Sequence, residues 1–144
     1  MKAPADMIER ARRAMDRAYA PYSGFQVGCC VKGASGALYA GANVENAAYP
    51  QGWCAETSAI AALIAAGERR ILEIVVLGAK SDGKGGYVDE PSALCTPCGG
   101  CRQKLNEFAE AGALVHVGGP SGVRRSFTLG ELLPAAFGPR NLAP

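Results

Sequence analysis

Residues 55–78 decide the fold, and they read AETSAIAALIAAGERRILEIVVLG. The first half, residues 55–66, is rich in Ala, Ile and Leu, which predicts a buried helix that ends at Gly67, since glycine is common just past helix ends. The second half contains residues 73–78, a short and largely apolar run that predicts a central strand buried on both faces. A buried helix that leads to a buried strand indicates a sheet covered by helices.

The segments on either side repeat this alternation. Residues 6–20 carry apolar side chains at helical spacing among charged ones, and Pro21 ends the predicted helix. The other predicted elements are strands over residues 25–31, 37–40 and 113–117, a helix over residues 99–111, loops over residues 43–52 and 81–90, and a short C-terminal helix or turn after residues 127–133. Alternating strands and helices predict the α/β class, with helices on the faces of one sheet.

Length and composition indicate one globular domain over residues 1–144. Of the 144 residues, 49% are hydrophobic and 19% charged, and the formal net charge of +2 is too small to indicate nucleic-acid binding. Residues 1–20 are charged throughout, unlike a secretory signal, and the longest apolar run, residues 59–66, is far shorter than the roughly 20 residues of a membrane helix. We therefore expect a soluble, cytoplasmic protein with reduced thiols.

Six cysteines and one histidine limit the chemistry that is available. Because His116 is the only histidine, zinc sites that need two or three imidazoles are excluded. His116 itself stands in an alternating run of apolar residues, which is typical of an ordinary strand position. Six cysteines without a secretory signal indicate a metal site or a reactive thiol rather than a disulfide framework.

Two short cysteine motifs stand at predicted helix starts. They are Cys54-Ala55-Glu56 and Pro97-Cys98-Gly99-Gly100-Cys101. The partial positive charge of a helix N-terminus favours a thiolate, which is the form of cysteine that binds zinc. Cys98 and Cys101 can reach one ion from a single helical turn, and Cys54 would supply a third ligand from the other helix.

The spacing of these motifs suits an open metal site. Three protein ligands leave a tetrahedral zinc ion with one position for water. Glu56, two residues beyond Cys54, can face the metal from the first helical turn without binding it. A carboxylate in that place can move a proton from water to a leaving group. Cys-x-Glu followed by Pro-Cys-x-x-Cys is also the known signature of zinc-dependent nucleobase deaminases.

Other interpretations of the cysteines remain open. A single Cys-x-x-Cys pair is about as often structural or redox-active as catalytic. Cys95 is a candidate fourth ligand, which would make the zinc site closed and structural. Cys29 and Cys30 are adjacent in a predicted strand and therefore point to opposite faces, so they cannot both serve one site. We expect both to be small apolar residues of the strand.

With these motifs in hand, the sequence resembles the small tetrameric cytidine deaminases over nearly the whole chain. The matching segments are residues 20–28, 41–49, 54–56, 97–103 and 132–139. The zinc motif is shared widely, whereas the Asn-x-Glu-Asn loop and the Leu-Leu-Pro-x-x-Phe-Gly-Pro tail are more specific to nucleoside deaminases. The resemblance implies a three-layer α/β/α cytidine-deaminase-like fold, with a mixed central sheet of about five strands and helices on both faces.

The resemblance also implies a role for each matching residue. Cys54, Cys98 and Cys101 bind one zinc ion per chain, and Glu56 moves protons. The expected substrate contacts come from Phe25 beside the pyrimidine ring, Asn43 and Glu45 at the ribose hydroxyls, the backbone of Ala55 at the base, Ala47 and Tyr49 at a neighbouring subunit's site, and Phe137 across an interface. The expected assembly is therefore a homotetramer whose sites are completed by neighbouring subunits.

The activity that follows is hydrolytic deamination of cytidine and 2′-deoxycytidine to uridine and 2′-deoxyuridine, with release of ammonia, as in pyrimidine salvage. The alternative within the superfamily is a deaminase of blasticidin S or of a modified pyrimidine nucleoside. A polynucleotide deaminase is disfavoured because the chain lacks a basic channel. A zinc-binding module without catalysis is the alternative from another class.

One position departs from the resemblance. Relatives with three zinc thiolates usually read Cys-Ala-Glu-Arg, and their Arg offsets the thiolate charge, whereas this chain has Thr57 there. Three thiolates and a zinc dication carry a net charge of −1, which makes the zinc a poorer acid for its water. Arg102, directly after Cys101, and main-chain N–H groups are the two candidates for compensation.

Overall fold

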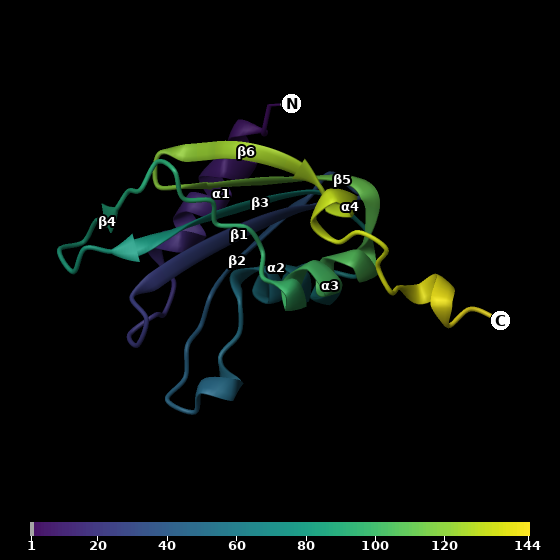
Figure 1. Ribbon diagram of the computed structural model, residues 1–144, viewed down its shortest axis with the longest axis horizontal. Helices are drawn as coiled ribbons and strands as arrows, with labels where there is room; N and C mark the ends of the chain where they lie inside the picture. Colours follow the sequence, from purple (N-terminus) through teal and green to yellow (C-terminus); the bar gives the residue numbers. More distant parts are fainter. Residues whose placement is uncertain (1) are drawn as a thin grey trace.

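Six strands form one mixed sheet in the computed structural model, which describes residues 2–144 (Figure 1). They are β1 (Phe25–Gly33), β2 (Leu38–Ala42), β3 (Ile71–Ser81), β4 (Tyr87–Val88), β5 (Ala109–Gly119) and β6 (Gly122–Thr128). The order is β2-β1-β3-β5-β6, and β4 pairs with the end of β3. Only the β3–β5 pair is parallel among these strands. The predicted mixed sheet is confirmed, with one strand more than the expected five.

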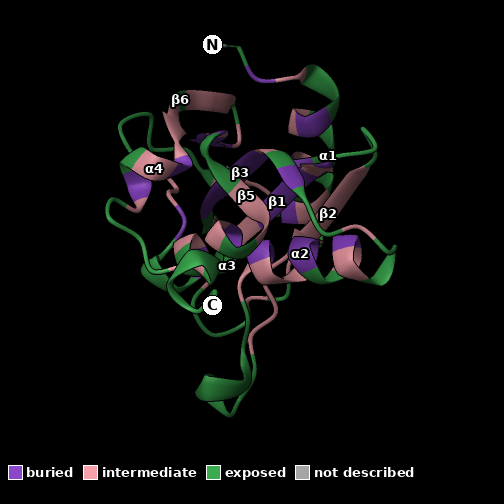
Figure 2. Ribbon diagram, turned by 90° about the vertical axis from the view of Figure 1, so that its right-hand side faces the viewer, coloured by how far each residue is buried: buried purple, intermediate pink, exposed green. Residues whose placement is uncertain are grey.

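Helices cover both faces of this sheet, as predicted. They are α1 (Ala5–Asp16), α2 (Ala55–Ala65), α3 (Gly99–Phe108) and the short α4 (Leu129–Leu132), together with the 3-10 turns η1 (Tyr49–Gln51) and η2 (Pro139–Asn141). None of the helices formed by residues 2–144 is long and apolar enough to cross a membrane. The loop that carries η1 and the segment that carries η2 both project away from the sheet (Figures 1 and 2).

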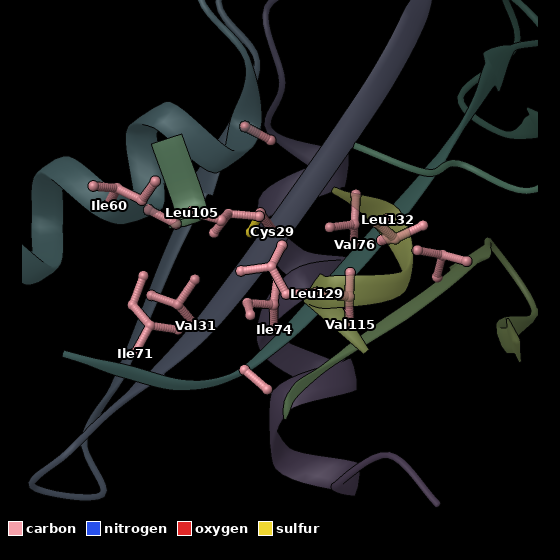
Figure 3. Close-up of a cluster of buried hydrophobic side chains, with 14 of the residues drawn as sticks. Cys29, Val31, Ile60, Ile71, Ile74, Val76, Leu105, Val115, Leu129 and Leu132 are labelled. Atoms are coloured by element: carbon pink, nitrogen blue, oxygen red, sulfur yellow. The ribbon is translucent and has the colours of Figure 1, made fainter. Parts of the chain in front are cut away.

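The sheet divides the buried side chains into two clusters. One face packs against α1 through Met7, Ala11 and Met15. The other face packs against α2, α3 and α4, and strand residues there meet helix residues such as Leu105 and Leu129 (Figure 3). The larger cluster on this second face fixes the positions of the three helices that lie there.

Cys29 and Cys30 are fully buried on opposite faces of β1, which confirms their predicted orientation. Cys29 belongs to the cluster under α2, and Cys30 belongs to the cluster under α1. Burial is the main cause that raises the pKa of the Cys30 thiol to about 12, so this thiol stays protonated and behaves as a small apolar group.

Two glycines let helices approach the sheet closely. A Cβ atom on Gly28 would lie 1.9 Å from the main-chain oxygen of Ala11 in α1. A Cβ atom on Gly41 would lie 2.4 Å from the Cβ of Ser58 in α2. Any larger residue at either position would therefore displace a helix. The contact at Gly41 matters for function, because it seats the N-terminal part of α2 against β2.

Several predicted boundaries are wrong, and pairing explains most of them. The first helix ends at Asp16 rather than at residue 20, because Tyr19 leaves the helix to form a bridge with Val44. Residues 109–111 are strand rather than helix, since Ala109 pairs with Ile71 of β3 and this tertiary contact overrides helix propensity. The predicted loop over residues 81–90 holds the two-residue strand β4.

β6 was not predicted as a strand, because it has no apolar alternation. All of its residues are half-buried or exposed, and two adjacent arginines stand in its centre. Its pairing with β5 places Ser126 beside His116. His116 is a fully buried strand residue, as predicted, and its ring nitrogens lie 2.6 Å from the Ser126 hydroxyl and 2.6 Å from a carboxylate oxygen of Glu73.

Candidate active site

Three thiols meet where the N-termini of α2 and α3 come together. Cys54 is the N-cap residue of α2, Cys98 is the N-cap residue of α3, and Cys101 lies in the first turn of α3. Their sulfur atoms all lie within 4.8 Å of one another. These two helix starts are the ones that the sequence predicted.

The three sulfurs suit a zinc ion in both chemistry and spacing. Zinc–sulfur bonds of about 2.3 Å in a tetrahedron place the sulfur atoms about 3.8 Å apart. The cluster lies within 4.8 Å, so a small adjustment of side chains suffices to close it around an ion. No side-chain hydrogen bond caps either helix start, which leaves the positive ends of the two helices beside the thiols.

The protein environment acts differently on the three thiols. Main-chain N–H donation from Cys101 is the main cause that lowers the pKa of Cys98, and Gly100 adds a second such contact. Burial is the main cause that raises the pKa of both Cys54 and Cys101. Main-chain N–H groups therefore already stabilise negative charge at Cys98, which was one of the two expected sources of compensation.

Glu56 follows Cys54 in the first turn of α2 and is only 4% exposed. Burial raises the pKa of its carboxyl above the usual value, while its own main-chain N–H, Lys104 and a hydrogen bond with Cys101 oppose that rise. The Glu56 carboxylate also contributes to the raised pKa of Cys54 and of Cys101, after burial, so it lies close to the thiol cluster. A buried carboxyl with a raised pKa beside a metal site is suited to accept and return a proton.

Cys95 lies outside the thiol cluster. It packs at the edge of the larger core, and a Cβ atom on Gly78 would lie 2.5 Å from the Cys95 sulfur and 3.2 Å from the Phe25 ring. Cys95 and Phe25 therefore share the space that Gly78 leaves open. Burial is the main cause that raises the pKa of Cys95 to about 12. Its sulfur is not among the three that lie within 4.8 Å of one another, which does not support the interpretation of a closed site with four thiolates.

Asn43 holds the start of β1 in place. Its side-chain oxygen accepts a hydrogen bond from the Val27 main-chain N–H at 2.8 Å, and its side-chain nitrogen donates to the Phe25 carbonyl at 2.8 Å. An amide oxygen and an NH₂ group each have capacity for one further hydrogen bond. Asn43 is thus fixed beside Phe25 with one donor and one acceptor left over.

Glu45 also has a structural role, which the sequence did not reveal. Its carboxylate accepts hydrogen bonds from the main-chain N–H of Tyr22 at 2.9 Å and of Ser23 at 3.1 Å, and from the Ser23 hydroxyl. These bonds, led by the one from the Ser23 hydroxyl, lower the pKa of Glu45. The carboxylate is therefore ionised and held rigidly above the loop that precedes β1.

A cavity of about 330 Å³ lies at this carboxylate. The residues that line it are Tyr22, Ser23, Glu45, Asn46, Tyr49 and Gly52. The rings of Tyr22 and Tyr49 meet edge to face across it, with centroids 5.7 Å apart. Its volume is at the lower end of the range of small-molecule sites, about 300–1,000 Å³.

Two expected substrate residues lie far out on the surface. Ala47 is exposed on the loop between β2 and α2, and Phe137 is 58% exposed on the C-terminal segment. The Phe137 carbonyl accepts hydrogen bonds from Gln103 at 2.8 Å and Asn106 at 3.2 Å, so α3 anchors this segment by its backbone while the ring faces outward. Tyr49 lines the cavity but remains 74% exposed.

Comparison with known proteins shows the family of this chain. Residues 1–117 match the family model of the cytidine and deoxycytidylate deaminase zinc-binding region. The chain belongs to this deaminase family. A cytidine deaminase of Halalkalibacterium halodurans is 36% identical over 131 residues, which is 91% of each chain. One of Mycobacterium tuberculosis is 38% identical over 128 residues, which is 89% of this chain and 84% of the relative.

Solved structures of the deaminase family agree with the fold. The crystal structure of a cytidine deaminase from Burkholderia pseudomallei superposes with a TM-score of 0.80 at 35% identity, covering 94% of this chain and 100% of the other. That of Mycobacterium tuberculosis superposes with a TM-score of 0.73 at 34% identity, covering 95% of this chain and 99% of the other. The predicted α/β fold is therefore confirmed.

In this deaminase chain a lysine contacts Thr57, the position at which the family resemblance led us to expect an arginine. The Lys104 ammonium donates a hydrogen bond to the Thr57 hydroxyl at 2.9 Å. The Arg102 guanidinium instead donates to the carbonyls of Pro97 at 2.7 Å and Leu132 at 2.9 Å. Sequence reasoning singled out Arg102 and missed Lys104, although a position three residues after Cys101 on a helix lies on the same face.

Proposed function

We propose that this chain catalyses the hydrolytic deamination of cytidine and 2′-deoxycytidine to uridine and 2′-deoxyuridine, with release of ammonia. The observation that carries this proposal is the buried Glu56 carboxyl against three thiols that can hold a zinc ion, in a chain of the deaminase family. Relatives that share 36% and 38% of their residues with it over most of the chain are named cytidine deaminases. The reaction forms a C4–O bond and breaks the C4–N bond.

Glu56 is the residue to which we assign the proton transfers. A zinc ion held by Cys54, Cys98 and Cys101, one per chain, supplies Lewis-acid activation of a water molecule. The Glu56 carboxylate accepts a proton from the attacking water and donates it to N3 of the pyrimidine. It then accepts the proton of the hydroxyl group newly bonded to C4 and donates it to the departing amine. Its burial excludes bulk water, so that the proton is exchanged with the substrate rather than lost.

We assign Asn43 and Glu45 to the ribose hydroxyls. Both side chains are fixed by hydrogen bonds to the main chain around the start of β1, so they are preorganised before the sugar arrives. A carboxylate accepts from a hydroxyl, while an amide both donates and accepts. Phe25, whose ring shares the space at Gly78 with Cys95, is assigned to the pyrimidine ring, and the main chain of Ala55 to the base.

We further propose that the active unit is a homotetramer. Tyr49 and Phe137 are large apolar side chains that remain 74% and 58% exposed on segments that project from the sheet (Figure 1). Exposed apolar side chains that gather in a patch commonly mark a site of protein–protein contact. We assign them, together with Ala47, to the substrate site of a neighbouring subunit. We also assign residues 1–144 to one domain, which acts in the cytoplasm in pyrimidine salvage.

Light scattering tests the assembly, and the expected mass is that of four chains. Replacing Phe137 by alanine is expected to lower kcat/KM for cytidine by about 10- to 100-fold, the effect of losing a well-packed apolar contact with the substrate. Leu142→Ala is the matched control, because Leu142 is 78% exposed on the same segment. A monomer that deaminates cytidine at the full wild-type rate would contradict the proposed assembly.

Steady-state rates on a nucleoside panel test the substrate. Cytidine and 2′-deoxycytidine are expected to give the highest kcat/KM, above blasticidin S and modified pyrimidine nucleosides. Single-stranded DNA is expected to remain unchanged, since the net charge of +2 provides little attraction for a polyanion. A higher kcat/KM for blasticidin S than for either nucleoside would replace the proposed substrate by the alternative one.

A further inference from the structure

Lys104 links the two helices that carry the thiol cluster. It lies on α3, three residues after Cys101, and its ammonium donates a hydrogen bond to the hydroxyl of Thr57 on α2 at 2.9 Å. Thr57 directly follows Glu56, which lies two residues after Cys54. The positive charge of Lys104 therefore lies where the helix that follows Cys54 meets the helix that follows Cys98 and contains Cys101.

The metal site and Glu56 together carry a net negative charge, which the Lys104 ammonium can offset. Three thiolates around a zinc dication carry a net charge of −1, and an ionised Glu56 adds a further −1. Arg102 is committed to two main-chain carbonyls, one of them on Leu132 of α4, so its guanidinium serves to tie α3 to α4.

We propose that Lys104 is the counter-charge of the thiolate metal site, held in place by Thr57. Its ammonium stabilises the ionised thiolates, so that the site binds zinc more tightly and keeps the metal a stronger acid. Lys104 is a positioning residue in this account, since it touches Thr57 rather than the metal or the substrate. The inference rests on the proposed function for the identity of the metal site, but it concerns metal affinity and not the substrate.

The test is the zinc dissociation constant, measured by competition with a chromogenic chelator. Lys104→Gln removes the charge and retains an NH₂ donor for Thr57, and we expect zinc binding to weaken by about three- to tenfold, as for a partly exposed charge pair. Lys104→Arg keeps the charge and is expected to bind zinc within about twofold of wild type. Lys84→Gln, on an exposed loop, is the matched control.

Two further variants separate charge from packing. The double variant Thr57→Arg with Lys104→Gln moves the positive charge from α3 to α2. It is expected to restore most of the zinc affinity that Lys104→Gln loses. High salt is expected to shrink the difference between wild type and Lys104→Gln, because the interaction is electrostatic. A structural role for the lysine predicts neither rescue by Thr57→Arg nor dependence on salt.

The outcomes test the counter-charge proposal separately from the proposed function. If Lys104→Gln binds zinc as tightly as wild type, the counter-charge inference is wrong, whether or not the wild type deaminates cytidine. If the affinity falls and Thr57→Arg rescues it, the inference stands. A wild-type protein that binds zinc in this charge-dependent way but leaves cytidine unchanged would instead overturn the proposed function.

Discussion

Glu56→Gln is expected to keep one zinc ion per chain and to lose about 10²- to 10⁴-fold in kcat for cytidine, the usual contribution of a general acid–base group. The amide has the shape of the carboxyl but cannot accept and return a proton. Glu56 is buried beside the thiol cluster but does not belong to it. Its replacement therefore leaves the three candidate zinc ligands in place. Initial rates and metal content measured on one sample check both halves of this prediction.

The control for this variant is Glu107→Gln, which makes the same chemical change at an exposed position on α3. It is expected to retain the wild-type rate. Thermal unfolding of both variants establishes that each is folded. If Glu56→Gln deaminated cytidine at the wild-type rate, the assignment of Glu56 to the proton transfers would be wrong.

Removal of a thiol ligand is expected to have the second large effect. Cys98→Ala leaves two thiols, so zinc content is expected to fall from about one ion per chain to nearly none after brief dialysis against a chelator, and cytidine turnover is expected to fall with it. The melting temperature is expected to fall as well, because a metal that binds only the folded state stabilises that state. Atomic absorption and thermal unfolding provide the two measurements.

Cys95→Ala provides a matched control that also tests the alternative site. Cys95 is close to Glu56 and Cys54 but does not belong to the three-sulfur cluster. The variant is expected to retain one zinc ion per chain and most of its activity. Loss of zinc from Cys95→Ala to the same extent as from Cys98→Ala would establish a closed site with four thiolates.

The sequence predicted that Cys54, Cys98 and Cys101 come together, because short-range rules control their positions. Both cysteine motifs lie at helix starts that the local composition defines. Glu56 lies two residues after Cys54 in the first turn of its helix, which brings it toward the thiol cluster. The alternation of Cys29 and Cys30 likewise follows from the two-residue period of a strand. These features need no knowledge of the tertiary structure.

Features that depend on long-range contacts were missed. The hydrogen bond of Lys104 to Thr57 joins residues 47 positions apart, and the sequence pointed to Arg102 because it is adjacent to a ligand. The structural role of Glu45 could not be predicted from the sequence, because its hydrogen-bond partners Tyr22 and Ser23 lie in an earlier segment of the chain. β6 lacks an apolar alternation, since all of its residues are half-buried or exposed, and only its pairing with β5 identifies it as a strand. For Lys104 and Glu45 the deciding partner lies far along the chain.

The most direct test of the central claim is the conversion of cytidine by purified wild-type protein of known zinc content. We expect uridine and ammonia to appear in equal amounts, turnover to stop when a chelator removes the metal, and turnover to return when zinc is added back. A protein with one zinc ion per chain that leaves cytidine, 2′-deoxycytidine and the rest of the panel unchanged would contradict this account and identify the chain as a zinc-binding module without deaminase activity.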